Sequence, residues 1–167
     1  MISNFKGLSV LIVDDIRDVR TLTRSLLHTL GIDDVLEASD GKSALEILAS
    51  YKRDLIITDL SMKPMNGIDL TRALRQPGVT LNPAIPVLVL SAHAEASYVE
   101  QALEAGVNEF LAKPLTRAGL QQKLEAMVER PRAVVRAPTY LGPDRRRRAL
   151  RIRKRLRKSD QQGHTLI

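Results

Sequence analysis

Apolar residues in this chain fall into two alternating patterns. Five short runs rich in Val, Ile and Leu have the length and composition of buried strands, and they cover residues 8–13, 35–38, 55–57, 86–90 and 109–112. Between and after them, apolar residues recur at steps of three and four, as in amphipathic helices, over residues 16–31, 41–51, 68–74, 95–105 and 116–129. This alternation predicts a doubly wound α/β domain with a five-stranded parallel sheet between two helical layers.

Polar residues and glycines mark the ends of several segments. Asp40-Gly41 opens the second helix, and Asn66 is expected to cap the helix that begins at residue 68. Gly31 and Gly106 end the first and fourth helices. Short connections of this kind are typical of a doubly wound sheet.

Length and composition narrow the class of protein. A chain of 167 residues is long enough for one domain with a real core and an appendage. It has no cysteine, which excludes disulfides and thiolate metal sites and is compatible with an intracellular location. No apolar run approaches the length of a membrane span, and residues 1–7 do not resemble a signal peptide. A cytoplasmic protein is therefore expected.

The net charge of +7 hides a division along the chain. Residues 1–129 hold 13 Lys and Arg against 17 Asp and Glu, a net charge of −4, whereas residues 130–167 hold 13 against 2, a net charge of +11. The expected organisation is a globular domain over 1–129, a linker over 130–144 and an arginine-rich tail over 145–167. Such an asymmetry favours an anionic partner for the tail.

Charged and hydroxyl side chains follow four of the five predicted strands. Asp14 and Asp15 come after the first strand, Asp59 after the third, Ser91 after the fourth and Lys113 after the fifth. Because the carboxyl ends of parallel strands share one edge of the sheet, these residues are expected to converge on one pocket. A single Asp at a strand end is more often only a turn cap, so the combination is what favours a ligand site.

Three carboxylates with no His or Cys among them favour a hard cation, and Mg²⁺ is the expected one. Mg²⁺ beside Asp59 would neutralise an incoming phosphoryl group and align it for in-line attack. Lys113 adds a second positive charge, and the Ser91 hydroxyl can hydrogen-bond a phosphoryl oxygen. Asp59 then suits the role of a nucleophile that forms an aspartyl phosphate.

These residues lie in motifs that resemble those of the CheY-like response-regulator receiver domains. The motifs are Asp14-Asp15 after Val-Leu-Ile-Val, Asp59 followed by Met62, Pro64 and Gly67, Ser91-Ala92, and Phe110-Leu-Ala-Lys113-Pro114, and they match in order and spacing over residues 6–129. Each motif is weak alone, whereas the set is highly specific. The resemblance implies a flavodoxin-like sheet with strand order 2-1-3-4-5, and the intact set favours a working phosphoacceptor over a degenerate receiver.

The resemblance also implies a function. Asp59 would take a phosphoryl group from a histidine kinase or its phosphotransfer protein, with Mg²⁺ held by Asp15, Asp59 and the carbonyl of Ser61, and by Asp14 through water. Such a protein is a signalling switch rather than a classical enzyme. It would catalyse only its own phosphorylation from small donors and its own dephosphorylation.

In this family, Ser91 would move toward the phosphate while Phe110 turns inward, which reshapes the face formed by the fourth helix, fifth strand and fifth helix for a downstream protein. The Lys113-Pro114 bond is usually cis. Ser91 stands where Thr is frequent, and Phe110 lacks the hydroxyl of the switch tyrosine, which argues against a partner that needs it. His93 would influence the lifetime of the phosphoaspartate, although a solvated loop histidine is the plainer interpretation.

The composition changes beyond residue 130. Pro131, Pro138, Gly142 and Pro143 are expected to prevent regular structure there. Asp144 would then cap a basic helix with a narrow apolar stripe formed by Ala149, Ile152 and Leu156. Such a helix repels itself and would fold on an anionic partner, so the tail is expected to be largely disordered or helical.

Three kinds of partner suit the tail. Clustered arginine attracts nucleic acid or any acidic surface, for which Tyr140 offers a stacking ring. Cyclic di-GMP is a sharper hypothesis, because arginine suits its phosphates and its guanine edges; the chain is similar to CheY-like flagellar effectors that bind this dinucleotide through an arginine-rich C-terminal segment. The third kind is a protein that would dock on Leu150, Ile152 and Leu156. The candidate cyclic di-GMP contacts are Tyr140, Asp144, Arg145, Arg146, Arg147, Arg148 and Arg151.

The preferred function is therefore a phosphorylation-dependent switch whose basic tail adds a second input or an output contact, with cyclic di-GMP binding and direction to the flagellar motor as the sharper hypothesis for the tail. One alternative is a nucleic-acid-associated regulator in which the receiver gates an arginine-rich arm. The other is a phosphorelay intermediate, which would not need the tail.

Overall fold

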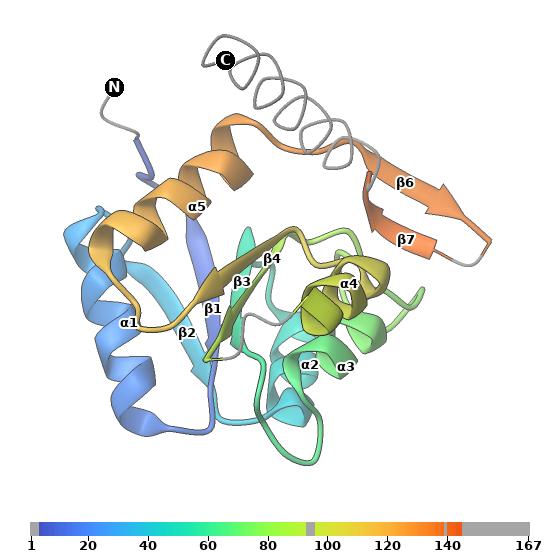
Figure 1. The fold of residues 1–167 in the computed structure, drawn as a ribbon, viewed down its shortest axis with the longest axis horizontal. Helices are drawn as coiled ribbons and strands as arrows, with labels where there is room; N and C mark the ends of the chain where they lie inside the picture. Colours follow the sequence, from blue (N-terminus) through green and yellow to red (C-terminus); the bar gives the residue numbers. More distant parts are fainter. Residues whose placement is uncertain (1–3, 93–95, 139, 145–167) are drawn as a thin grey trace, which may run out of the picture.

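The computed structural model describes residues 4–92, 96–138 and 140–144. Its main sheet is parallel, with strand order β2-β1-β3-β4-β5 (Figure 1). The strands are β1 (Ser9–Val13), β2 (Asp34–Ala38), β3 (Leu55–Asp59), β4 (Val87–Ser91) and β5 (Glu109–Ala112). The predicted flavodoxin-like topology is thus confirmed.

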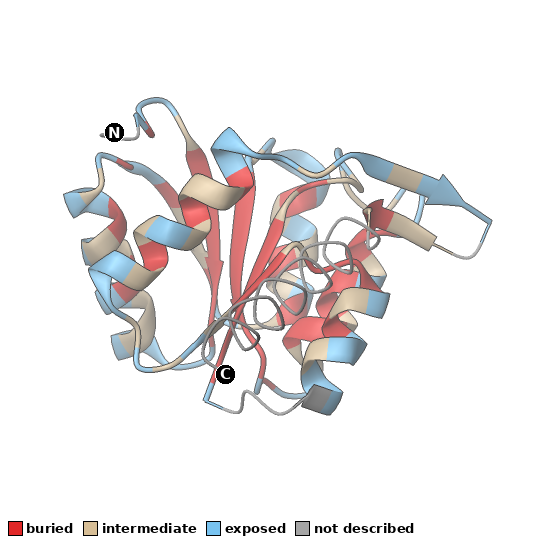
Figure 2. Ribbon diagram, turned by 45° about the horizontal axis from the view of Figure 1, so that its top comes forward, coloured by how far each residue is buried: buried red, intermediate tan, exposed pale blue. Residues whose placement is uncertain are grey.

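Helices cover both faces of this sheet. They are α1 (Arg17–Thr29), α2 (Gly41–Ser50), α3 (Gly67–Leu74), α4 (Ala96–Ala105) and α5 (Arg117–Glu129). Side chains alternate along β1, so that Val10 and Ile12 pack in a cluster with α1 and α5, while Leu11 and Val13 pack with α2, α3 and α4. The strands are consequently buried along most of their length, as Figure 2 shows. No helix in the described part of the chain combines the length and apolar character needed to cross a membrane.

The predicted helix starts are confirmed at two places. The Asp40 carboxylate accepts a hydrogen bond from the Ser43 N–H at 2.7 Å at the start of α2. Asn66 and Asp69 form a reciprocal capping box at the start of α3, with the Asp69 N–H donating to Asn66 Oδ1 at 2.8 Å. The second cap fixes the loop that leaves β3.

The prediction that residues 131–143 lack regular structure is wrong. They contain an antiparallel hairpin of β6 (Val134–Ala137) and β7 (Tyr140–Pro143). Pro138 lies in the connection and Pro143 at the end of β7, where a missing N–H is tolerated, so neither proline interrupts the pairing. The Asp144 N–H donates to the Ala133 carbonyl at 2.8 Å and closes the hairpin.

Two other predictions concern residues that the structure does not describe. His93 lies outside the described residues, and so does the predicted basic helix beyond residue 144. The proposed division into domain, linker and tail stays a prediction.

Candidate phosphoacceptor site

Two buried carboxylates lie at the carboxyl edge of the sheet. Asp14 directly follows β1 and Asp59 ends β3, and these neighbouring strands are in register with Val13 opposite Thr58. Asp14 is 1% exposed and Asp59 5%, whereas Asp15 is exposed. One oxygen from each of the three acids lies within 4.8 Å of the others. The topology therefore brings together the acids that the sequence predicted.

Lys113 brings a cation to these acids from the edge strand. Its Nζ lies 2.9 Å from Asp59 Oδ1 and 3.9 Å from Asp14 Oδ2. Its backbone N–H donates to the Ser91 carbonyl at 2.7 Å, which ties the end of β5 to the end of β4. The Lys113-Pro114 peptide bond is cis, as predicted. A single ammonium group thus faces two buried carboxylates.

The surroundings of Asp14 favour a bound cation. Burial raises the pKa of Asp14 above its ordinary value of 3.8, the hydrogen bond from the Ile16 N–H opposes this, and the Asp59 carboxylate raises the pKa further. Asp14 Oδ2 is buried and has no hydrogen-bond partner among the described residues. An acceptor oxygen of this kind beside two more carboxylates fits a hard divalent cation such as Mg²⁺.

The loop after β3 is fixed at close range. The Gly67 N–H donates to the Leu60 carbonyl at 2.9 Å, and the Thr58 hydroxyl donates to the Asp59 carbonyl at 3.0 Å. A Cβ atom on Gly67 would overlap the Asp59 carbonyl oxygen, so only glycine lets α3 begin this close to β3. Ser61, the predicted carbonyl ligand, lies exposed in this loop.

Ser91 and Phe110 lie on the two strands beyond Asp59. Ser91 ends β4 and is 1% exposed, and the residue before it, Leu90, pairs with Asp59. Ser91 therefore lies at the same edge as the acids. Phe110 is opposite Val89 within β5, and its side chain is buried in the cluster beneath α2, α3 and α4. Phe110 thus packs in the hydrophobic core rather than at the sheet edge that carries the acids.

Arg20 supports the site, although the sequence does not single it out. Its Nη1 donates to the Asp14 carbonyl at 2.7 Å, and its Nε pairs with Glu37 Oε1 of β2 at 3.2 Å. This bridge holds the turn after β1 against β2. In the sequence Arg20 is one of several arginines on the polar side of a helix, and no pattern distinguishes it.

Tyr140 and Asp144, the two predicted tail contacts in the described part of the chain, do not join the acid cluster. Tyr140 begins β7 and Asp144 directly follows it, and Gly142 of this strand approaches Gly106 in the turn between α4 and β5. That turn lies at the amino edge of the sheet, opposite the acids. Residues 145–148 and Arg151 lie outside the described residues.

The fold and the site together define a class of protein, a doubly wound α/β domain with an acidic, lysine-bearing pocket at the carboxyl edge of its sheet. The family model of the response regulator receiver domain matches residues 10–125. The chain therefore belongs to the response-regulator receiver family and carries a CheY-like receiver domain of a two-component system. Proteins of this class act as signalling switches.

Similar proteins come from chemotaxis and from other signalling systems. The chain is 38% identical to chemotaxis protein CheY-3 of Vibrio cholerae over 125 residues, covering 75% of this chain and 95% of the relative. It is 39% identical to chemotaxis protein CheY of Pseudomonas aeruginosa over 123 residues, covering 74% and 98%.

Among solved structures, the receiver domain of the Pseudomonas aeruginosa sensor histidine kinase PA1611 matches with a TM-score of 0.63 at 32% identity, covering 71% of this chain and 95% of that one. That structure has a magnesium ion coordinated in its active site cleft.

Proposed function

We propose that Asp59 accepts a phosphoryl group from a histidine kinase or phosphotransfer protein, and that this event switches the protein between two signalling states. The observation that carries the proposal is the 2.9 Å contact between Lys113 Nζ and Asp59 Oδ1, beside a buried oxygen of Asp14 that accepts no hydrogen bond from the described residues. A carboxylate held at the end of a buried strand is a well-oriented nucleophile, and the ammonium group offsets negative charge on the phosphoryl oxygens.

Asp15, Asp59 and the carbonyl of Ser61 would hold Mg²⁺ directly, and Asp14 would hold it through water. When bound, the metal neutralises part of the negative charge on the phosphoryl oxygens. The Asp59 carboxylate attacks phosphorus, so that an O–P bond forms as the N–P bond of the donor phosphohistidine breaks. Lys113 and the Ser91 hydroxyl then bind the phosphoryl oxygens.

The proposed output is a change on the face formed by α4, β5 and α5. Ser91 would move toward the phosphoryl group, and Phe110 would repack in the space that this movement alters. Phe110 is 8% exposed and lies on the strand that ends at the Lys113 segment, so a shift at the site has a short route to this face. A downstream protein would recognise the altered face.

Incubation with acetyl phosphate and Mg²⁺, followed by intact mass measurement, tests the phosphoacceptor. The wild type is expected to gain the mass of one phosphoryl group, and Asp59→Asn is expected to gain none. Asp18→Asn, an exposed acid on α1, is the matched control and should behave as the wild type. A wild type that stays unmodified would overturn the proposal.

We also propose that the basic segment, residues 130–167, binds cyclic di-GMP and directs the protein to the flagellar motor. The support is its charge of +11 and the chemotaxis proteins among the relatives. Titration of the full chain with cyclic di-GMP and with duplex DNA, before and after replacing residues 145–148 with alanine, separates the candidates. Saturable, guanine-dependent binding that needs these arginines supports the proposal, whereas salt-labile binding to any duplex supports a nucleic-acid-associated regulator.

The phosphorelay alternative makes a different prediction. Onward transfer of the phosphoryl group that survives removal of residues 131–167 would favour a relay intermediate. Loss of signalling on the same truncation, with Asp59 still phosphorylated, would favour a role for the basic segment in the output.

A further inference from the structure

The backbone N–H, the carbonyl and one carboxylate oxygen of Asp14 are all engaged in hydrogen bonds. The N–H donates to the Ala38 carbonyl of β2 at 3.1 Å, and Oδ1 accepts from the Ile16 N–H at 2.9 Å. The carbonyl oxygen accepts from Arg20 Nη1 at 2.7 Å. The first two contacts are made by backbone atoms of the neighbouring residues, whereas the third is made by a side chain. Arg20 can therefore be substituted to test what this contact does.

The contact to Arg20 acts on the next residue, Asp15. A peptide group is planar, so an arginine that holds the Asp14 carbonyl oxygen also fixes the N–H and the Cα of Asp15. Asp15 is exposed, and no hydrogen bond or ion pair within the described ranges holds its carboxylate. One of its oxygens nevertheless lies within 4.8 Å of oxygens of Asp14 and Asp59. The direction of the backbone therefore determines whether the Asp15 carboxylate faces the other two acids.

Neighbouring charges hold the Arg20 side chain in place. This side chain is 17% exposed, and its Nε pairs with Glu37 Oε1 of β2 at 3.2 Å. The other Glu37 oxygen pairs with Arg24 Nη2 at 2.8 Å, and Arg24 also donates to the Val35 carbonyl at 3.1 Å. A guanidinium presents its donors in a rigid fork, so Arg20 binds the Asp14 carbonyl and the Glu37 carboxylate at the same time. The fork thus ties the turn after β1 to β2.

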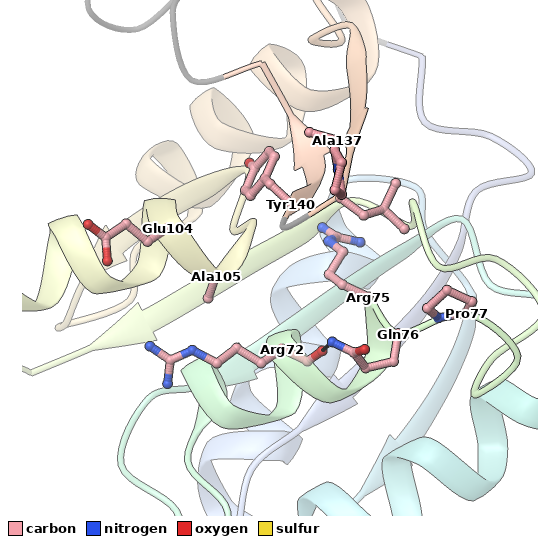
Figure 3. Close-up of a pocket in the computed structure, with 10 residues that line it drawn as sticks. Arg72, Arg75, Gln76, Pro77, Glu104, Ala105, Ala137 and Tyr140 are labelled. Atoms are coloured by element: carbon pink, nitrogen blue, oxygen red, sulfur yellow. Dashed lines mark hydrogen bonds between the residues drawn. The ribbon is translucent and has the colours of Figure 1, made fainter.

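Arg75, directly after α3, is a second arginine that binds carbonyls, and it shows what is particular to Arg20. It is 4% exposed and donates to the carbonyls of Pro83, Ile85 and Gly106, which lie before β4 and β5 at the amino edge of the sheet. Figure 3 shows its guanidinium extending toward the hairpin. Arg75 therefore fastens loops at the edge opposite the acids. Arg20 instead binds the peptide group between two of the acids.

Charge and geometry predict opposite effects of Arg20 on a bound cation. A guanidinium near the acids repels a divalent cation, so through charge alone its removal tightens Mg²⁺ binding. A guanidinium that orients a ligand residue has the reverse effect, and outer contacts of this kind contribute about 10–100-fold to metal affinity. We propose that Arg20 is a positioning residue that orients Asp15 for the metal, and that this geometric effect outweighs the repulsion. The inference deepens the magnesium site proposed above and rests on it.

Calorimetric titration of the full chain with Mg²⁺ tests the inference. Arg20→Met is expected to weaken Mg²⁺ binding by about tenfold. Arg20→Lys is expected to weaken it as well, because one ammonium group replaces the fork that binds the Asp14 carbonyl and Glu37 together. Arg24→Met is the matched control, since it removes the same charge from the same helix and from the same glutamate. It leaves the contact to the Asp14 carbonyl intact and is expected to keep the wild-type affinity.

Two further measurements separate positioning from a general loss of stability. With acetyl phosphate as the donor, Arg20→Met is expected to need more Mg²⁺ for half-maximal phosphorylation, while its rate at saturating Mg²⁺ returns to within about twofold of the wild-type rate. Without metal, the Ile16 amide, which donates to Asp14 Oδ1, is expected to exchange faster with solvent in Arg20→Met than in Arg24→Met. Circular dichroism of each variant verifies folding.

The outcomes separate this inference from the site on which it rests. Weaker Mg²⁺ binding in both Arg20 variants, with wild-type affinity in Arg24→Met, supports the positioning role. Unchanged or tighter binding in Arg20→Met overturns that role and leaves the magnesium site standing. Equal losses in Arg20→Met and Arg24→Met also overturn it, because the contact to the Asp14 carbonyl is then not what matters. A wild type that binds no Mg²⁺ overturns both the site and the inference.

Discussion

The ammonium group of Lys113 lies 2.9 Å from Asp59 Oδ1, although β4 separates the strands that carry the two residues. The Asp59 side chain is 6% exposed and that of Lys113 25%, so the pair is only partly screened by water. The same carboxylate is the proposed metal ligand. The positive charge of Lys113 therefore weakens binding of a divalent cation at the same carboxylate. Both cations nevertheless stabilise the negative charge of a phosphorylated Asp59.

Replacing Lys113 with methionine is expected to tighten Mg²⁺ binding by about tenfold and to slow phosphorylation. Removal of a positive charge a few ångströms from the carboxylates lowers the electrostatic cost of adding the metal. The same change removes a cation from the phosphoryl oxygens. Calorimetry gives the metal affinity, and mass measurement over time gives the phosphorylation rate. Lys42→Met, exposed on α2, is the control, and an unchanged Mg²⁺ affinity in Lys113→Met would contradict the argument.

Asp14→Asn is expected to stabilise the metal-free protein and to weaken Mg²⁺ binding. The substitution removes a buried charge that desolvation and Asp59 both disfavour, while an amide oxygen still accepts from the Ile16 N–H. Urea unfolding with and without Mg²⁺ measures both effects. The stabilisation should shrink or reverse when Mg²⁺ is present. If the metal-free variant is less stable than the metal-free wild type, the buried charge of Asp14 does not destabilise the protein as argued.

The stability difference between wild type and Asp14→Asn should depend on pH. Because the pKa of Asp14 is raised in the folded state, the native protein holds this proton more tightly than the unfolded chain does. As pH rises from 3.8 toward the raised pKa, the wild type therefore loses stability relative to the variant, and above it the difference is constant. Metal-free unfolding at successive pH values would show the trend, and a difference that grows in favour of the wild type would have the wrong sign.

The sequence predicted most of the receiver because strand ends are fixed by topology. Once five buried strands are parallel, Asp14, Asp59 and Lys113 have to share one edge. Arg20 and Arg75 were not predictable in the same way, because an arginine on a helix is normally solvated and only the folded chain shows which carbonyls it reaches. The hairpin is not evident from the sequence because its prolines normally break regular structure, whereas here they occupy positions where no ladder hydrogen bond is required.

Gly67→Ala is expected to destabilise the domain and slow phosphorylation, because the added Cβ overlaps the Asp59 carbonyl oxygen and pushes α3 away from β3. Overpacking of this kind costs about 1–3 kcal/mol. Gly41→Ala is a close control, since Gly41 also opens a helix but its added Cβ would meet only the flexible Met65 side chain. Thermal unfolding and phosphorylation rates compare the two. Equal effects of both substitutions would show that the approach to Asp59 is unimportant.

Glu109 connects the hairpin to the strand that carries Phe110. It is 8% exposed, and its carboxylate lies 3.4 Å from Arg132 Nη2, just before β6, and 3.5 Å from Lys123 Nζ of α5. Glu109→Gln removes the anion from two ion pairs at a partly buried position, so we expect a loss of about 1–3 kcal/mol. The loss should be concentrated in the hairpin, whose amide protons should exchange faster with solvent while those of β1 and β3 keep their relative protection.

Glu100→Gln, an exposed acid on α4, is the matched control and should change neither stability nor exchange. A second variant, Glu109→Gln combined with Arg132→Met, should recover part of the lost stability because it also removes one of the two cations that face the substituted position. Uniformly faster exchange across all strands would instead mean that Glu109 supports the whole domain. In that case the ion pair would not be a specific attachment of the hairpin to β5.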